Sequence, residues 1–449
     1  MLKKAALFVL VALATGAWAA EFPLELKTLS QKEAMAGPGG IGAFAQLKSE
    51  KPAAITKEPD AVSDRPLYGA LTTPGGKGQS LVFRLDESQG KGKGYDQLIV
   101  DVNKNGDLTD DPVCKALKEE EKESSPMPYE HALFGPIEMA AAKVGPWVPN
   151  LYAEMFVMNR RAPANSRIAA GQLQLKDASY LQATIEINGA KETIGIFDAN
   201  CNFQLGDKSQ MQLLKTPQGE NRDLQWGDAV LRDRSGSGKP ATALAGTLVE
   251  PYSELVYVGP NPYTMTLAKD LTTVALEPYS GPVGELQVKN GESMALLIMA
   301  RESAPGQWEA LSPDVASGKA KVPVGTCALY SCVVAGKDSG NALVAATGMN
   351  ADSKKTLKIT EGKSAALVCG APLEFKVQAQ KESGGGGGFL GALVSGGTSN
   401  LLISAQILGA GGEAYRTFAR SDGQAVGGPK FKVLGQNGKE LGSGQLQFG

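Results

Sequence analysis

Apolar residues occur in short runs along the chain, and each run ends in residues that favour turns. Examples are the segments 80–85, 97–101 and 183–187, the last of which is followed by the pair Asn188-Gly189. Such runs are typical of β-strands, and an Asn-Gly pair between them is a strong signal for a hairpin turn. The chain also holds 55 glycines and 25 prolines, which suit frequent turns. The pattern predicts an all-β, multi-domain protein built from sandwiches or barrels.

The second half of the chain has the same strand pattern. Apolar runs lie at 284–288, 295–299, 342–346, 373–377 and 401–405. The chain closes with a predicted hairpin, in which Asn437-Gly438 turns the segment 430–433 back onto 444–448. We therefore expect an Ig-like β-sandwich over residues 280–449, with a flexible Gly-rich loop at 384–397.

The first nineteen residues have the pattern of a secretory signal peptide. Lys3 and Lys4 precede an apolar run over 5–13, and Ala17-Trp18-Ala19 has the form of a cleavage site. We expect the mature chain to begin at Ala20 and to be periplasmic or extracellular. The remaining chain divides into a Gly/Pro-rich lead-in over 20–67, a β-rich domain with calcium-like loops over 68–279, and the C-terminal sandwich over 280–449.

Charge and composition narrow the classes of partner. Lys and Arg number 45 against 47 Asp and Glu, so no basic surface is expected for nucleic acid or an anionic membrane. No apolar run after the signal segment is long enough to span a bilayer as a helix. Five cysteines leave one thiol over if two disulfides form. Cys327 and Cys332 lie close in sequence, and either could instead pair with Cys369; the sequence does not choose among these pairings.

One short segment carries the clearest chemical signal. In Asp101-Val-Asn-Lys-Asn-Gly-Asp-Leu-Thr-Asp-Asp111, side-chain oxygens occupy loop positions 1, 3 and 5 and glycine occupies position 6. This arrangement wraps a short peptide around a hard cation such as Ca²⁺. Position 12 is Pro112 where an EF-hand has an acid, so an earlier acid must close the site. The candidate ligands are Asp101, Asn103, Asn105, Asp107, Asp110 and Asp111. The alternative is an Asx-rich turn that binds no metal.

A second loop repeats the first in weaker form. Asp198 lies 97 positions after Asp101 and also follows an apolar strand-like run, which suggests two copies of one strand-loop unit. Phe203 stands where the first loop has its turn glycine, and this loop has only two carboxylates. A structural turn is therefore favoured here, with a second calcium site as the alternative. Its candidate ligands are Asp198, Asn200, Asn202 and Asp207.

The residue inventory excludes several kinds of enzyme. The single histidine, His131, rules out a three-histidine zinc site and an H-E-x-x-H protease motif. No G-x-S-x-G elbow, P-loop or C-x-x-C motif is present. A carbohydrate-active hydrolase that uses a pair of carboxylates needs none of these, and it stays open as the alternative function.

Several segments together resemble a group of uncharacterised exported bacterial β-rich proteins with EF-hand-like or dockerin-like calcium loops. The resemblance is carried by 65–69, 83–88, 94–111, Gly227-Asp-Ala-Val230 and the closing 444–449. It implies export and calcium loops, and it implies no activity. We therefore expect a calcium-stabilised structural or binding protein of the cell envelope or extracellular space. Its partner would be a protein or polysaccharide outside the cytoplasm.

Overall fold

The computed structural model is built almost entirely of β-strands. It describes residues 19–36, 42–71, 81–90, 94–117, 129–158, 171–216, 219–233, 249–289, 293–337, 343–349, 355–381, 392–394, 401–420 and 426–446. Helical turns within these ranges are α1 (Gln31–Ala36) and the 3₁₀ turn η2 (Ala140–Ala142). The predicted all-β, multi-domain fold is confirmed. In this part of the chain, no helix has the length and apolar character needed to cross a membrane.

The first sandwich packs two four-stranded antiparallel sheets together. One sheet has the order β4 (Leu67–Leu71), β5 (Leu81–Asp86), β6 (Gln97–Val100), β7 (Val113–Lys115). The other has the order β3 (Ala43–Leu47), β10 (Gly171–Asp177), β9 (Asn150–Met158), β8 (Tyr129–Glu138). Side chains from both sheets, such as Phe83 and Leu151, are fully buried in one core. Burial of this apolar area is the main force that joins the sheets.

The second sandwich follows directly, because Ala178 alone separates β10 from the next strand. Its five-stranded sheet has the order β16 (Val249–Pro251), β15 (Ala229–Asp233), β12 (Ala190–Phe197), β11 (Ser179–Ile187), β2 (Glu25–Thr28). The facing sheet has the order β1 (Ala20–Pro23), β19 (Thr273–Pro278), β18 (Asn261–Leu267), β17 (Leu255–Val258). Trp147, which lies between β8 and β9 of the first sandwich, belongs to this buried core together with Ile194 and Val274.

The C-terminal part combines a large antiparallel sheet with a small one. Along the large sheet the order is β14 (Gly219–Gln225), β13 (Gln210–Thr216), β22 (Gln307–Leu311), β21 (Met294–Ala304), β24 (Gly325–Lys337), β25 (Leu343–Met349), β31 (Ala414–Arg420), β30 (Leu401–Leu408), β28 (Glu374–Lys381). Strand β26 (Leu357–Ile359) also pairs with β24, and β29 (Ala392–Val394) pairs with β30. The small sheet has the order β23 (Lys319–Pro323), β20 (Val283–Lys289), β27 (Ser364–Val368). Both sheets contribute to one buried core.

Both predicted Asn-Gly hairpins form. Asn188 and Gly189 turn β11 into β12 with φ of 52° and 78°, the left-handed values that a two-residue hairpin turn requires. Gly438 has φ of 74° in the loop between β32 (Lys430–Leu434) and β33 (Glu440–Gln445).

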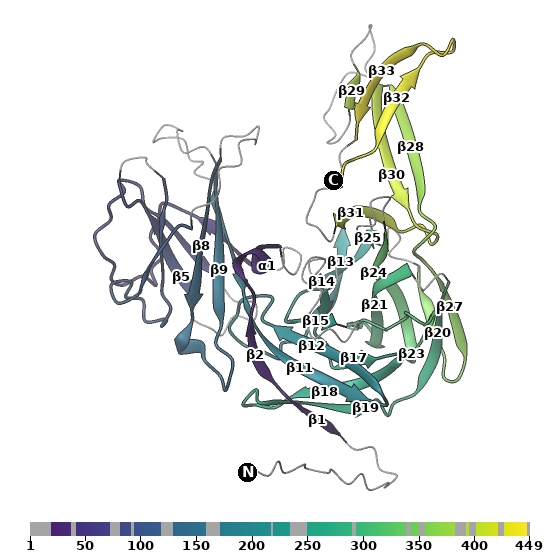
Figure 1. Ribbon diagram of the computed structural model, residues 1–449, viewed down its shortest axis with the longest axis horizontal. Helices are drawn as coiled ribbons and strands as arrows, with labels where there is room; N and C mark the ends of the chain where they lie inside the picture. Colours follow the sequence, from purple (N-terminus) through teal and green to yellow (C-terminus); the bar gives the residue numbers. More distant parts are fainter. Residues whose placement is uncertain are drawn as a thin grey trace, which may run out of the picture.

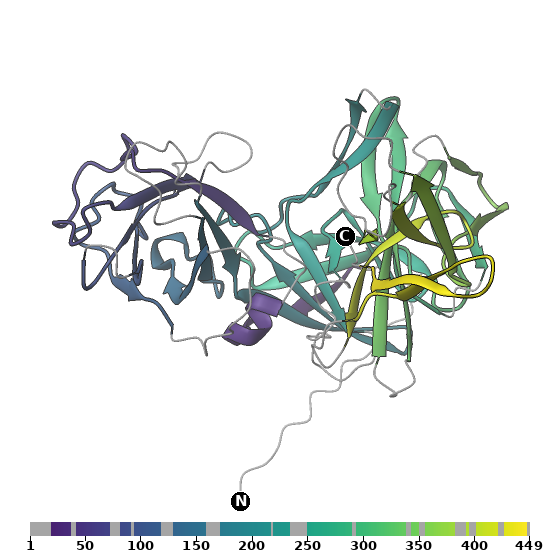
Figure 2. The same cartoon turned by 90° about the horizontal axis from the view of Figure 1, so that it is seen from above.

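Residues 20–67 do not form one sheet of their own. Strands β1, β2 and β3 pair with β19, β11 and β10 in three different sheets. Figures 1 and 2 show the first sandwich (purple to blue) at one end of the molecule and the C-terminal strands (green to yellow) at the other, with β11 and β12 between them. Residues 1–18 of the expected signal peptide, and 384–391 and 395–397 of the Gly-rich loop, lie outside the described residues.

Candidate functional site

The first loop leads from β6 to β7 and turns its side-chain oxygens inward onto its own backbone. Asp101 accepts the N–H of Asn105 on Oδ1 at 3.0 Å and the N–H of Gly106 on Oδ2 at 2.9 Å. Asn103 Oδ1 also accepts the Asn105 N–H at 3.0 Å, and Asn105 Oδ1 accepts the Asp107 N–H at 2.6 Å. The side-chain oxygens at loop positions 1, 3 and 5 therefore all accept backbone N–H groups of their own loop, as in an Asx-rich turn.

The two acids at the end of the first loop fold back across it. Asp110 accepts hydrogen bonds from the side-chain amides of Asn103 at 3.3 Å and Asn105 at 2.9 Å. Asp111 is only 8% exposed; its Oδ1 accepts the N–H of Val102 at 3.0 Å, whereas its Oδ2 is buried without a hydrogen-bond partner. Burial, and then the carboxylates of Asp101, Asp110 and Asp107, raise the pKa of Asp111 to about 6.

A segment from before β4 covers the first loop. The carbonyl of Gly106 accepts N–H groups from Thr56 at 2.8 Å and Lys57 at 3.2 Å. Lys57 Nζ lies 3.0 Å from Asp107 Oδ2, and hydrogen bonds from Thr109 are the largest cause of the lowered pKa of Asp107. Asp107 is thus placed at the edge of the loop, beside a lysine.

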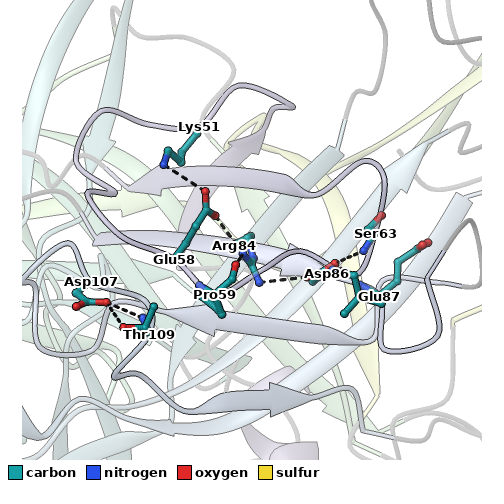
Figure 3. A network of polar contacts seen from close by, with 10 residues as sticks. Lys51, Glu58, Pro59, Ser63, Arg84, Asp86, Glu87, Asp107 and Thr109 are labelled. Carbon is teal, nitrogen blue, oxygen red and sulfur yellow. Dashed lines mark hydrogen bonds and ion pairs between the residues drawn. The ribbon is translucent and has the colours of Figure 1, made fainter.

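A buried arginine holds that covering segment in place. Arg84 on β5 donates to Glu58 Oε2 at 3.1 Å and to Asp86 Oδ2 at 3.1 Å, and Asp86 Oδ1 accepts the N–H of Ser63 at 2.8 Å (Figure 3). A buried guanidinium needs such partners because its desolvation is costly. The network fixes residues 58–63 on the sheet and so positions residues 54–57 over the loop.

The second loop reproduces five hydrogen bonds of the first. Asp198 accepts the N–H of Asn202 at 3.1 Å and of Phe203 at 2.6 Å, Asn200 Oδ1 accepts the Asn202 N–H at 3.0 Å, and Asn202 Oδ1 accepts the N–H of the following residue at 2.8 Å. Asn202 Nδ2 donates to Asp207, as Asn105 donates to Asp110. Each of these five bonds has its counterpart 97 positions earlier, which confirms the repeat.

The two loops also share their unusual backbone angles. Lys104 and Gly106 have φ of 58° and 77°, and the equivalent Cys201 and Phe203 have φ of 52° and 66°. A phenylalanine is strained there, and only its surroundings can hold it in this conformation. Phe203 and Cys201 are both buried in the core of the first sandwich, which supplies that support.

The surroundings of the two loops differ. In the first loop Asn103, Asn105 and Asp110 are exposed, whereas in the second Asp198, Asn202 and Phe203 are buried. The loops touch through Lys104, whose Nζ lies 4.5 Å from the centroid of the Phe203 ring. Burial lowers the pKa of Lys104, and the carboxylates of Asp198 and Asp101 oppose this shift. The second loop is therefore buried where the two sandwiches meet, and the first loop lies beside it and is exposed to solvent.

Two acids that the sequence did not single out as candidate ligands lie near the second loop. Asp177 at the end of β10 and Asp228 before β15 are buried, and each has one carboxylate oxygen without a hydrogen-bond partner. Burial is the main cause that raises the pKa of Asp177 to about 7 and that of Asp228 to about 9, and Asp198 raises the second further. The segment 227–230 drew notice only for its resemblance, since nothing local shows that Asp228 reaches a loop twenty residues away.

The donors available in the first loop are all oxygen atoms of carboxylate, amide and backbone groups. Oxygen ligands of this kind suit Ca²⁺, which takes six to eight of them in flexible geometry. Among the described residues, no three His, Cys, Asp or Glu side chains form a group that could hold a metal ion. A cation in the first loop would therefore need amide and backbone oxygens as well as carboxylates, which is the mixture that this loop provides.

Comparisons with protein-family models, curated proteins and solved structures found no match to this chain.

Proposed function

We propose that this is an exported structural or binding protein of the cell envelope or extracellular space, and that Ca²⁺ in the first loop stabilises it. The observation that carries the calcium assignment is the buried, unpartnered Oδ2 of Asp111 in a loop that also holds Asp101 and Asp110. A buried carboxylate oxygen without a partner is costly, and a cation would satisfy it.

Repulsion within the loop supports the same proposal. Asp101, Asp107, Asp110 and Asp111 fall within eleven residues, and the raised pKa of Asp111 reflects their mutual repulsion as well as its burial. A divalent cation would relieve this repulsion and keep all four charged. We expect an affinity in the range of extracellular calcium modules, about 10⁻⁴–10⁻³ M.

The position of the loop suggests what calcium would do. The first loop contacts the second through Lys104 and Phe203, at the place where the second loop enters the core of the first sandwich. Calcium that orders the first loop would therefore stiffen the junction between the two sandwiches. A stiffened array of sandwiches suits a role in binding or supporting a protein or polysaccharide outside the cytoplasm.

Thermal unfolding of the mature protein in EGTA and then in millimolar calcium tests the assignment. Because a ligand that binds only the folded state stabilises it by mass action, we expect the melting temperature to rise by roughly 2–8 °C in calcium. Magnesium should give a smaller rise, since it demands a tighter octahedral shell. Equal melting temperatures in EGTA and calcium would refute calcium stabilisation.

The repeat supplies a matched pair of variants for this test. Asp110→Asn and Asp207→Asn change equivalent positions of the two loops, and both original acids accept a hydrogen bond from an Asn side chain. If the first loop is the site, the calcium-dependent rise is lost or greatly reduced in Asp110→Asn and in Asp111→Asn and is kept in Asp207→Asn. The reverse pattern would move the site to the second loop.

Export is tested separately. N-terminal sequencing of the protein recovered from the periplasm or the medium should find Ala20 as the first residue. Recovery of the uncleaved chain from the cytoplasm alone would contradict the proposed location.

A further inference from the structure

Two cysteines from different sheets meet in the core of the C-terminal part. Cys332 lies on β24 of the large sheet, and Cys369 follows β27 of the small sheet directly. Both are 0% exposed and belong to the same buried cluster, and both are free thiols in this structure.

A shared set of polar contacts brings the two thiols together. Cys332 Sγ lies 3.2 Å from the hydroxyl of Tyr415, which donates to Glu413 Oε1 at 3.3 Å. The same carboxylate oxygen accepts the N–H of Gly370, the residue next to Cys369. Contact with the Cys332 thiol, and then burial, raise the pKa of the Cys369 thiol.

The backbone confirms how closely the two segments approach. A Cβ built on Gly370 would lie 3.3 Å from Cγ1 of Val334, which is two residues beyond Cys332 on the same strand. The chain at 369–370 therefore crosses directly over β24 at 332–334. Side chains two apart on a strand share one face, so Cys332 points to the face over which Cys369 passes.

The other three cysteines have different surroundings. Burial raises the pKa of Cys327 to about 12, while Arg301 lowers it and Glu309 raises it by smaller amounts. Cys201 donates to the carbonyl of Leu175 at 3.4 Å. Cys114 is half-buried on β7 in the first sandwich.

We propose that Cys332 and Cys369 form a disulfide that joins the two sheets of the C-terminal core. The oxidant is an external disulfide, either of low molecular weight or in another protein. One thiolate attacks it and releases one thiol, and the second thiolate then attacks the mixed disulfide and releases the other thiol. Two cysteine thiols are oxidised and one external disulfide is reduced. The inference rests on the proposed export, because thiols stay reduced in the cytoplasm.

Refolding in a defined glutathione buffer tests the bond independently of export and of calcium. The reduced, denatured protein is refolded with oxidised and reduced glutathione, quenched in acid, denatured and alkylated. Of the five cysteines, three should react before reduction and all five after it. Peptide mapping should find Cys332 joined to Cys369, and the oxidised form should melt roughly 5–10 °C above the reduced form.

Two variants complete the test. Cys332→Ala should leave all four remaining cysteines reactive before reduction, since Cys369 loses its partner. Cys327→Ala should keep the bond and leave two reactive before reduction. Five reactive cysteines in the wild-type protein, or a map that joins Cys369 to Cys327, would overturn the proposal.

Discussion

The ammonium nitrogen of Lys104 lies 4.5 Å from the centroid of the Phe203 ring. Lys104 is the fourth residue of the first loop, and Phe203 is the sixth residue of the second. The carboxylates of Asp198 and Asp101 also attract this ammonium group. One lysine thus couples the solvent-facing loop to the loop that fills the core of the first sandwich.

A double-mutant cycle measures this coupling. Lys104→Met keeps the alkyl chain and removes the charge, and Phe203→Leu keeps an apolar side chain and removes the ring. We expect a coupling energy of about 0.5–1 kcal/mol, the size of a cation–π contact at a partly exposed site. Urea unfolding in EGTA provides the free energies without a contribution from calcium.

The control cycle pairs Lys57→Met with the same Phe203→Leu. Lys57 is exposed and forms its ion pair with Asp107, so the two changes should be additive. A coupling as large as that of Lys104 would show that the effect is general electrostatics and not the contact with the ring.

Glycine at position 6 of the first loop is required for two separate reasons. Gly106 has φ of 77°, and a Cβ there would lie 2.4 Å from the carbonyl oxygen of Ala54. Gly189 has nearly the same φ, 78°, with nothing within 4 Å of its Cβ position. A comparison of alanine substitutions at the two glycines therefore separates the cost of backbone strain from the cost of steric overlap.

We expect Gly189→Ala to lower the free energy of unfolding by about 1 kcal/mol, the cost of a left-handed alanine. Gly106→Ala should cost roughly 2–4 kcal/mol, because it also displaces the segment over the loop. Urea unfolding of both variants gives the comparison. Equal losses would mean that residues 54–57 move aside freely.

The buried carboxyl of Asp228 makes stability depend on pH. Its pKa is about 9 in the folded protein, against about 4 when unfolded, so the folded state binds the proton more tightly. This contribution is fully present below about pH 4 and is lost as pH rises toward 9. Asp177, whose pKa is raised to about 7, also stabilises the folded state at low pH, and its contribution is lost as pH rises from about 4 to 7.

Urea unfolding between pH 7.5 and 8.5 in EGTA tests Asp228 above the range in which Asp177 titrates. The buried Asp198, whose pKa is raised by burial and then by Asp177, is common to every variant compared. We expect the wild-type protein to lose on the order of 1 kcal/mol per pH unit there. Asp228→Asn should flatten the slope, since an amide oxygen can still accept the N–H groups of Gly206 and Asp207. As a control, Asp60→Asn changes an exposed acid and should leave the slope as in the wild type. An unchanged slope in Asp228→Asn would contradict the assignment.

The sequence predicted the local features well. The strands, both Asn-Gly hairpins and the equivalence of the two loops depend on hydrogen bonds between residues a few positions apart. Asp101 and Asn105, for example, meet because they are four residues apart in one turn. The prediction that the second loop is a structural turn also rested on a local feature, the phenylalanine at the position where the first loop has glycine.

What the sequence could not determine depends on how the sheets pack. The chain alone determined that strands form, where they turn and which oxygens face one another within each loop, because these follow from backbone sterics and short-range hydrogen bonds. Only the tertiary structure decided that Phe203 enters the core of the first sandwich, that Asp177 and Asp228 lie buried near the second loop, and that Cys332 rather than Cys327 meets Cys369. Each of these contacts joins residues from different strands or sheets, and burial of apolar surface brings sheets together without a pattern that neighbouring residues reveal.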